Sequence, residues 1–162
     1  ALADPQAAGV HSVRESVLFT YSGLASNDSE IFRINAEAKA AGERPVVRMI
    51  KEGYLPDMNK RGTMRTVYDG RYKFSRYFAP TQHHSPRSID ELYQYNDVEL
   101  FDLQSDPAEI RNLAVDRTAN ASLIMQMSGK LEAIIKTEIG ADDGRELPDI
   151  PSIDWTIDKA DL

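Results

Sequence analysis

The sequence contains no cysteine among its 162 residues. This absence excludes disulfide bonds, cysteine-ligated zinc, iron–sulfur clusters and any thiol nucleophile within the chain. A cysteine-free chain suits oxidising and reducing surroundings equally, so the sequence assigns no cellular compartment.

Acidic residues outnumber basic ones, and long apolar runs are scarce. Lys and Arg total 19 against 26 Asp and Glu, which gives a formal charge of −7. Nucleic-acid binding needs concentrated cations to neutralise phosphates, so this balance argues against a generic DNA- or RNA-binding role. No apolar run approaches the roughly 18–20 residues that span a bilayer. We expect neither a nucleic-acid partner nor a membrane span.

The N-terminal sequence ALADPQAAGV has no initiating Met, no basic region and no apolar core, so it does not resemble a signal peptide. We expect a processed chain or a fragment of a longer protein. The alternative is a mature N-terminus left after export, and the sequence does not separate the two.

Alternating side chains and turn residues predict a small antiparallel sheet. The expected strands are Val17–Tyr21, Met64–Tyr68, Tyr72–Phe78 and Glu99–Leu103, with a further short strand at Val46–Ile50. Asp69-Gly70 lies between the second and third of these strands and favours a tight hairpin turn, because glycine accepts positive φ.

Helical periodicity predicts one long amphipathic helix from about Ala119 to Ile139, with Gly140 as its C-cap. Shorter helices are predicted over 29–41, capped by Ser29, and from the helix-start pattern at 106–109. The predicted fold class is α+β: about four antiparallel strands covered on one face by the long helix. A connecting or extension segment over 1–62 would precede this subdomain at 63–140. An acidic tail over 141–162 would follow it, attached through Trp155.

The loop after the third predicted strand holds the candidates for substrate binding. His83 and His84 lie in this loop, between Pro80 and Pro86, and Arg76 lies on the strand before it. Arginine offers a fixed fork of donors and histidine can donate or accept, which suits an anionic or hydroxylated substrate. The alternative is structural, with Arg76 paired to a local carboxylate and the histidines bonded to backbone groups.

No local pattern marks a nucleophile, a phosphate-binding loop or a metal site. Adjacent side chains of an extended chain point in different directions, which disfavours a metal shared by the two histidines. Asp142-Asp143 lacks the alternating oxygen ligands of a calcium loop, so we expect it in a solvated turn. No catalytic residue and no metal ligand is predicted in this chain.

Two segments carry an ordered set of motifs: RTVYDGRYKFSRYF at 65–78 and VELFDLQSDPAEIRNLA at 98–114. A basic strand with Tyr72-Lys73 is followed by ELFDL, a DP.E..NLA segment and a terminal helix. This order closely resembles the C-terminal subdomain of the sulfatase family, in the alkaline-phosphatase-like superfamily, with Phe101 in place of the commoner Tyr. By residue type these motifs are structural, and we expect Asn112 to hydrogen-bond nearby backbone.

The resemblance implies a parent enzyme that hydrolyses sulfate esters; related superfamily members leave phosphate or phosphonate esters as the alternative. It also implies a catalytic N-terminal domain with calcium and with a C/S-x-P-x-R motif that becomes formylglycine. The nearest match here, Ser105-Asp106-Pro107-Ala108-Glu109, ends in Glu, so we expect the chain to be inactive alone.

Two functions from different classes remain open at this point. The first is the C-terminal part of a sulfatase, which completes the fold beside its catalytic partner domain and shapes the cleft for a sulfate ester. The second is a free-standing, non-catalytic binding module that has the same architecture. The residues themselves carry no cofactor prediction, since calcium and formylglycine belong to the absent domain.

Overall fold

The computed structural model describes residues 14–23, 28–149 and 153–157. The strands in these ranges are β1 (Val17–Ser22), β2 (Thr63–Tyr68), β3 (Tyr72–Phe78) and β4 (Asp97–Asp102). The α-helices are α1 (Ser29–Ala40), α2 (Pro45–Glu52), α3 (Ile89–Tyr95) and α4 (Ala121–Glu138). Two short 3₁₀ turns, η1 (Pro80–Gln82) and η2 (Leu113–Val115), complete the elements.

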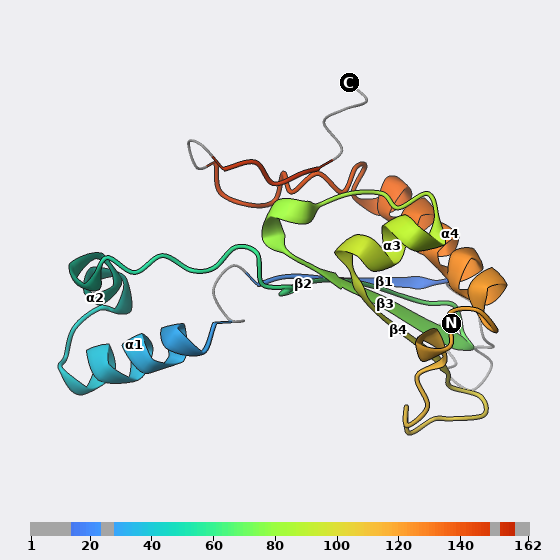
Figure 1. The fold of residues 1–162 in the computed structure, drawn as a ribbon, viewed down its shortest axis with the longest axis horizontal. Coiled ribbons are helices and arrows are strands. Elements are labelled where there is room, and N and C mark those ends of the chain that lie inside the picture. The colour runs from blue at the N-terminus through green and yellow to red at the C-terminus, as the bar shows by residue number, and fades with distance from the viewer. Residues whose placement is uncertain (1–13, 24–27, 150–152, 158–162) are drawn as a thin grey trace, which may run out of the picture.

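The four strands form one antiparallel sheet in the order β1-β2-β3-β4 (Figure 1). The β2–β3 hairpin pairs Tyr68 with Lys73, and Gly70 in its turn has a φ of +91°. Only glycine adopts that backbone geometry without strain, so the predicted turn is confirmed. The four predicted strands of the sheet are confirmed as well.

The hydrophobic core lies between one face of the sheet and the helices α3 and α4 (Figure 1). Val67, Phe74 and Leu100 lie side by side across β2, β3 and β4 and are fully buried. They pack in one cluster with α4 residues such as Ile124 and Leu131. Each such side chain contributes roughly 1.5–3 kcal/mol on burial. The α+β class with a long C-terminal helix over the sheet is therefore confirmed.

The opposite face of the sheet stays largely open along β1. Side chains alternate across a strand, so Val17, Phe19 and Tyr21 point away from α4. They are 47%, 52% and 47% exposed. At the centre of this face Thr66 and Ser75 share a 2.8 Å hydrogen bond. The face thus combines an apolar margin with a small polar centre.

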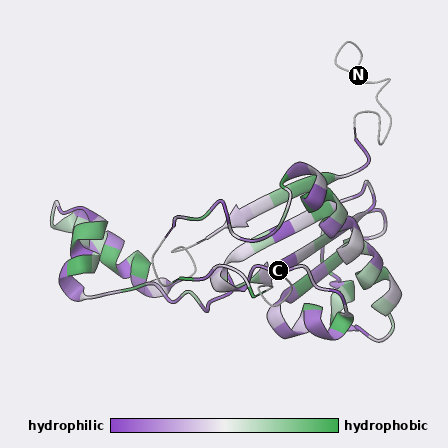
Figure 2. Cartoon of the chain, turned by 90° about the horizontal axis from the view of Figure 1, so that it is seen from above, coloured by the Kyte–Doolittle hydropathy of each residue, from purple (hydrophilic) through white to green (hydrophobic). Residues whose placement is uncertain are grey.

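The helices α1 and α2 form an arm that projects away from the sheet (Figure 1). Figure 2 shows hydrophobic and hydrophilic residues mixed around both helices of this arm. The helix predicted over 29–41 is confirmed, although the cap is Asp28, which accepts a hydrogen bond from the Glu30 N–H.

The strand predicted at Val46–Ile50 is wrong, because this segment is part of α2. Pro45 occupies the first helical turn, where its fixed φ suits a helix, and Gly53 ends the helix in the left-handed region. Arg48 and Glu52 form an ion pair one turn apart. These helical signals outweigh the β-branched side chains of Val46 and Val47.

The helix predicted from 106–109 is also wrong. The carboxylate of Asp106 accepts hydrogen bonds from the N–H groups of Ile110 and Arg111, which lie beyond the reach of an N-cap. Glu109 has a φ of +55°, which a helix does not allow. The segment is an irregular turn between β4 and η2.

The tail after α4 returns to the loop that follows β3. The His83 N–H donates to the Trp155 carbonyl at 2.9 Å, and the Ile157 N–H donates to the His83 carbonyl at 3.1 Å. Attachment of the tail near Trp155 is thus confirmed. Residues 1–13 and 24–27 of the predicted 1–62 segment, and 150–152 and 158–162 of the tail, lie outside the described residues. In the described part of the chain, no helix combines the length and apolar character needed to cross a bilayer.

Candidate functional site

The three predicted substrate-binding residues all have buried side chains. Arg76 lies on β3, on the face covered by α4, while His83 and His84 follow η1. The exposed fraction of each residue is 0%. Their polar atoms therefore face the interior of this chain, and their bonding partners define what each one does here.

Arg76 and Arg65 lie directly opposite each other on β3 and β2. The carboxylate of Asp142, just beyond α4, lies between their guanidinium groups. Arg65 donates to Asp142 Oδ1 from Nε at 3.1 Å and from Nη2 at 2.9 Å. Arg76 donates from Nη2 to Oδ2 at 2.7 Å. One tail carboxylate thus bridges two buried cations.

His83 is the third residue on this carboxylate, with its Nδ1 2.8 Å from Asp142 Oδ1. Burial by itself raises the pKa of Asp142, but the hydrogen bond from His83 and the charges of Arg76 and Arg65 lower it from 3.8 to about 2. Asp142 is therefore ionised at neutral pH, and the proton of the contact belongs to His83. We call Arg65, Arg76, His83 and Asp142 the buried ion cluster.

Two more carboxylates border the buried ion cluster. Glu132 of α4 lies 3.1 Å from Arg76 Nη2, and Glu146 of the tail lies 2.5 Å from Arg65 Nη2. Glu146 also accepts a 2.9 Å hydrogen bond from Ser22 at the end of β1. Among the described residues, Arg76 Nε, Arg76 Nη1 and His83 Nε2 have no hydrogen-bond partner.

His84 belongs to a separate, structural arrangement. Its Nδ1 donates to the Gln82 carbonyl at 2.7 Å, and its Nε2 accepts from Asn96 Nδ2 at 3.0 Å. Its ring packs edge-on against Phe78 and Tyr95. His84 therefore fastens the loop after β3 to the end of α3.

The solvated turn predicted for Asp142-Asp143 is wrong for Asp142. Two buried guanidinium groups on one sheet face require an anion, and Asp142 supplies it. Asp143 does lie nearer the surface, where it pairs with Arg145 at 2.6 Å. No sequence pattern marks Arg65 as a site residue, although the predicted hairpin places it opposite Arg76. Nothing in the local sequence marks Asp142, because its contact partners lie 59 to 77 residues away.

Calcium, which the sulfatase resemblance implies for the catalytic domain, has no fitting site in the described part of this chain. No three His, Asp or Glu side chains there converge as a metal site. Asp142, the most buried carboxylate near other acidic groups, already receives donors from two arginines and a histidine. No step that depends on calcium can therefore be assigned to these residues.

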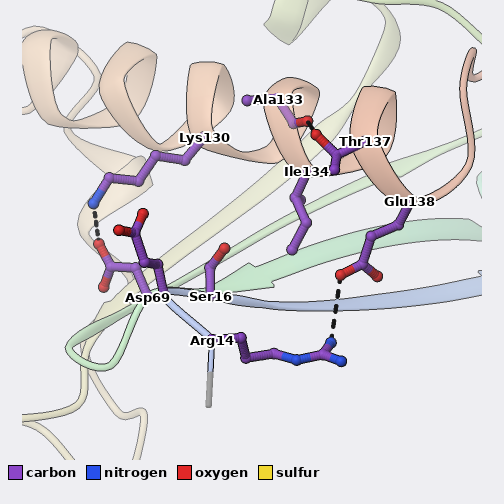
Figure 3. Close-up of a pocket in the computed structure, with 9 residues that line it drawn as sticks. Arg14, Ser16, Asp69, Lys130, Ala133, Ile134, Thr137 and Glu138 are labelled. Atoms are coloured by element: carbon purple, nitrogen blue, oxygen red, sulfur yellow. Dashed lines mark hydrogen bonds and ion pairs between the residues drawn. The ribbon is translucent and has the colours of Figure 1, made fainter. Parts of the chain in front are cut away.

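A groove of about 720 Å³ lies on another side, between the start of β1, the β2–β3 turn and α4 (Figure 3). Both cations that line it are paired, Lys130 with Asp69 and Arg14 with Glu138. Figure 3 shows these two pairs at opposite ends of the groove, with Ile134 between them. Its remaining lining is Glu15, Ser16, Ala133, Ile134 and Thr137, so no further cation among the described residues lines it for an anionic ligand.

No protein-family model matches the chain, and no curated protein matches it.

Proposed function

We propose that this chain is the C-terminal subdomain of a sulfatase-type hydrolase, which completes the fold of a catalytic domain and borders its substrate cleft. The chain contributes no nucleophile. In this proposal Arg76, His83 and His84 fix the shape of the loop after β3. Direct contact of these three residues with a sulfate ester remains a prediction.

The proposal rests on the ion pairs that join the two sulfatase-like segments. Arg71 of the first segment donates to both carboxylate oxygens of Asp102 in ELFDL, at 3.1 and 2.7 Å. Lys73, two residues further on, pairs with Glu109 of the second segment. Residues that carry the resemblance in sequence are therefore one connected unit in space.

Asn112 of the NLA motif supplies the same kind of support. Its Oδ1 accepts from the N–H groups of Leu100 and Ala114, at 3.0 and 2.9 Å. Its Nδ2 donates to the Val98 carbonyl at 3.1 Å. One side chain thus joins β4 to η2, and the predicted backbone-bonding role of Asn112 is confirmed.

The open face along β1 supports a covering partner. Val17, Phe19 and Tyr21 form a row of large apolar side chains that remain about half exposed. Apolar groups gathered in this way on one face are typical of surfaces that another domain buries. A catalytic domain that packs beside the sheet would remove this row from water.

The test is a comparison of this chain with the longer protein that the proposal expects its gene to encode. We expect a C/S-x-P-x-R motif upstream, formylglycine at its first position by mass spectrometry, and hydrolysis of 4-nitrophenyl sulfate by the longer protein. The 162-residue chain should show no turnover and no stoichiometric calcium binding by calorimetry. Turnover by the purified chain contradicts the proposal, and a start codon close to Ala1 favours the free-standing module.

A further inference from the structure

The strand β1 forms one margin of the sheet, and β4 forms the other (Figure 1). In an antiparallel ladder, every second residue of an outer strand bonds to the neighbouring strand, and the residues between them direct their N–H and C=O groups outward. The Gly23 N–H donates to the Gly62 carbonyl at 3.2 Å and continues the β1–β2 register. Counted back in twos from Gly23, the residues that bond to β2 are Tyr21, Phe19 and Val17. The residues whose backbone groups point outward are Ser22, Thr20 and Leu18.

The outer edge of β4 is closed by the chain itself. The Asn112 side chain takes the place of a further strand there, because it accepts from the Leu100 N–H at 3.0 Å and donates to the Val98 carbonyl at 3.1 Å. The Asp102 carbonyl accepts two N–H groups of the following turn, at 3.1 and 2.8 Å. An added strand would have to displace these contacts, so β4 is protected from pairing.

The outer edge of β1 has no such closure in the part of the chain that the structure describes. No hydrogen bond from a described residue reaches the outward backbone groups of Leu18, Thr20 or Ser22. Thr20 is exposed, although its side chain lies on the face that α4 covers. Edge strands are usually protected by a charged residue, a proline or a bulge. The sequence VLFTYS has neither a charge nor a proline, and its register with β2 is unbroken.

We propose that the outer edge of β1 is an interaction site at which a second copy of this chain adds its own β1 in antiparallel orientation. The result is a dimer with a two-fold axis at Thr20. An open strand edge matches another strand, because the N–H and C=O groups of both strands repeat with the same spacing. Antiparallel pairing of two identical strands is isologous, so it closes after two copies and leaves no free β1 edge.

The side chains of β1 fit this pairing. With Thr20 opposite Thr20 of the second copy, Leu18 lies opposite Ser22, and the outward backbone groups of both strands meet. Phe19 then lies opposite Tyr21 on each side of the axis, at the positions where cross-strand side chains are closest. Aromatic pairs and threonine pairs are among the favourable cross-strand contacts. No like charges meet, because β1 carries none.

This inference goes beyond the proposed function and does not depend on it. A strand adds in the plane of the sheet, about 4.8 Å from its neighbour, so the open face remains available to a covering domain. The proposed catalytic domain would cover the face that carries Val17, Phe19 and Tyr21, whereas the second copy pairs with the edge. The two surfaces can therefore be tested separately.

Analytical ultracentrifugation of the 162-residue chain over a concentration series tests the proposal, and wild type should form a reversible dimer. Thr20→Pro removes an outward N–H that β2 does not use, so the fold should stay intact. The dissociation constant of the dimer should rise by about tenfold or more, because this hydrogen bond is lost on both sides of the axis. Thr20→Val keeps the N–H and the strand preference, so this matched control should dimerise like wild type. Circular dichroism and thermal unfolding check that both variants fold.

Charges at position 20 test the register. Because Thr20 lies at the axis, Thr20→Lys places two positive charges opposite each other, and Thr20→Glu places two negative charges there. Each variant alone should be monomeric at concentrations where wild type is dimeric. An equimolar mixture of the two should form a heterodimer, and added salt should weaken it.

A wild-type chain that remains monomeric up to its solubility limit overturns the proposal. A dimer that Thr20→Pro, Thr20→Lys and Thr20→Glu all leave unchanged also overturns it, because the interface would then lie elsewhere. If Thr20→Pro does not fold, the two charged variants decide, and a mixture of them that stays monomeric contradicts the pairing. None of these outcomes involves ester hydrolysis, so they leave the test of the proposed function unaffected.

Discussion

At the scale of single residues, the chain depends on charges that are buried and matched. Arg65 and Arg76 lie on the core face of the sheet, and carboxylates from α4 and the tail, Asp142 among them, balance their charges. Removing one partner of a buried ion pair leaves an uncompensated charge, which is far more damaging than losing an exposed pair. We therefore expect a large loss of stability when Asn replaces Asp142, because this exchange of one oxygen for an amide nitrogen removes the charge.

Asp142→Asn should lower the free energy of unfolding at pH 7 by about 2 kcal/mol, on the basis of the depressed pKa. Asp142 titrates near 3.8 when unfolded and near 2 when folded, so folding favours its charged form. Its stabilising contribution is complete above about pH 4 and disappears as the pH falls through 2. Urea unfolding of wild type and variant at pH 7, 4 and 2 should show their difference shrinking to near zero.

The matched control for this experiment is Asp143→Asn. Asp143 pairs with Arg145, whose side chain is 57% exposed, and such a pair contributes little in water. The control should stay within about 0.5 kcal/mol of wild type at pH 7. A stability gap between wild type and Asp142→Asn that persists unchanged to pH 2 contradicts the assigned role of the charge.

At the scale of elements, the same substitution should have opposite signs at two glycines. Gly70→Ala should destabilise the protein by about 1 kcal/mol, because φ of +91° disfavours a Cβ. Gly129→Ala should stabilise it by about 0.5–1 kcal/mol, because Gly129 lies inside α4 and an added Cβ meets no atom within 4 Å. Thermal and urea unfolding of both variants measure the change in the free energy of unfolding. The same change in both variants contradicts the roles assigned to the two glycines.

The sequence predicts those elements whose signals are local and consistent. Repeated apolar steps mark α4, and alternation around Asp69-Gly70 marks the hairpin. The helix α3 was missed although Ser88 accepts from the Glu91 N–H, a contact typical of a capping box. The strand predicted in place of α2 followed β-branched side chains, yet the helix there is set by its end residues and by packing against α1.

The sequence predicts one part of the buried ion cluster and not the other. Hairpin register alone places Arg65 opposite Arg76, so half of the buried ion cluster lies within reach of sequence reasoning. Asp142 does not, because an irregular tail brings it back to a strand 77 residues earlier. Contacts of that kind depend on the whole folded chain, and no periodicity or turn residue predicts them.

At the scale of the whole molecule, one face of the sheet lies in the chain's own core, and the opposite face is exposed along β1. Leu18 and Phe19 are neighbours on β1 and point to these opposite faces. Leu18 packs against the core cluster under α4, whereas Phe19 is 52% exposed. A substitution at Leu18 therefore tests the core of this chain, and a substitution at Phe19 tests whether a covering domain buries the opposite face.

Threonine at each position provides the test, since it suits a strand in both cases. In the 162-residue chain, Leu18→Thr should lower the free energy of unfolding by about 2 kcal/mol, and Phe19→Thr by less than about 1 kcal/mol. In the longer protein implied by the proposed function, Phe19→Thr should cost as much stability as Leu18→Thr, because the row of Val17, Phe19 and Tyr21 would then be buried. Thermal unfolding of both proteins with both variants measures this. A Phe19→Thr effect that stays small in the longer protein means that this face remains in water, and the catalytic domain would then have to pack elsewhere on the chain.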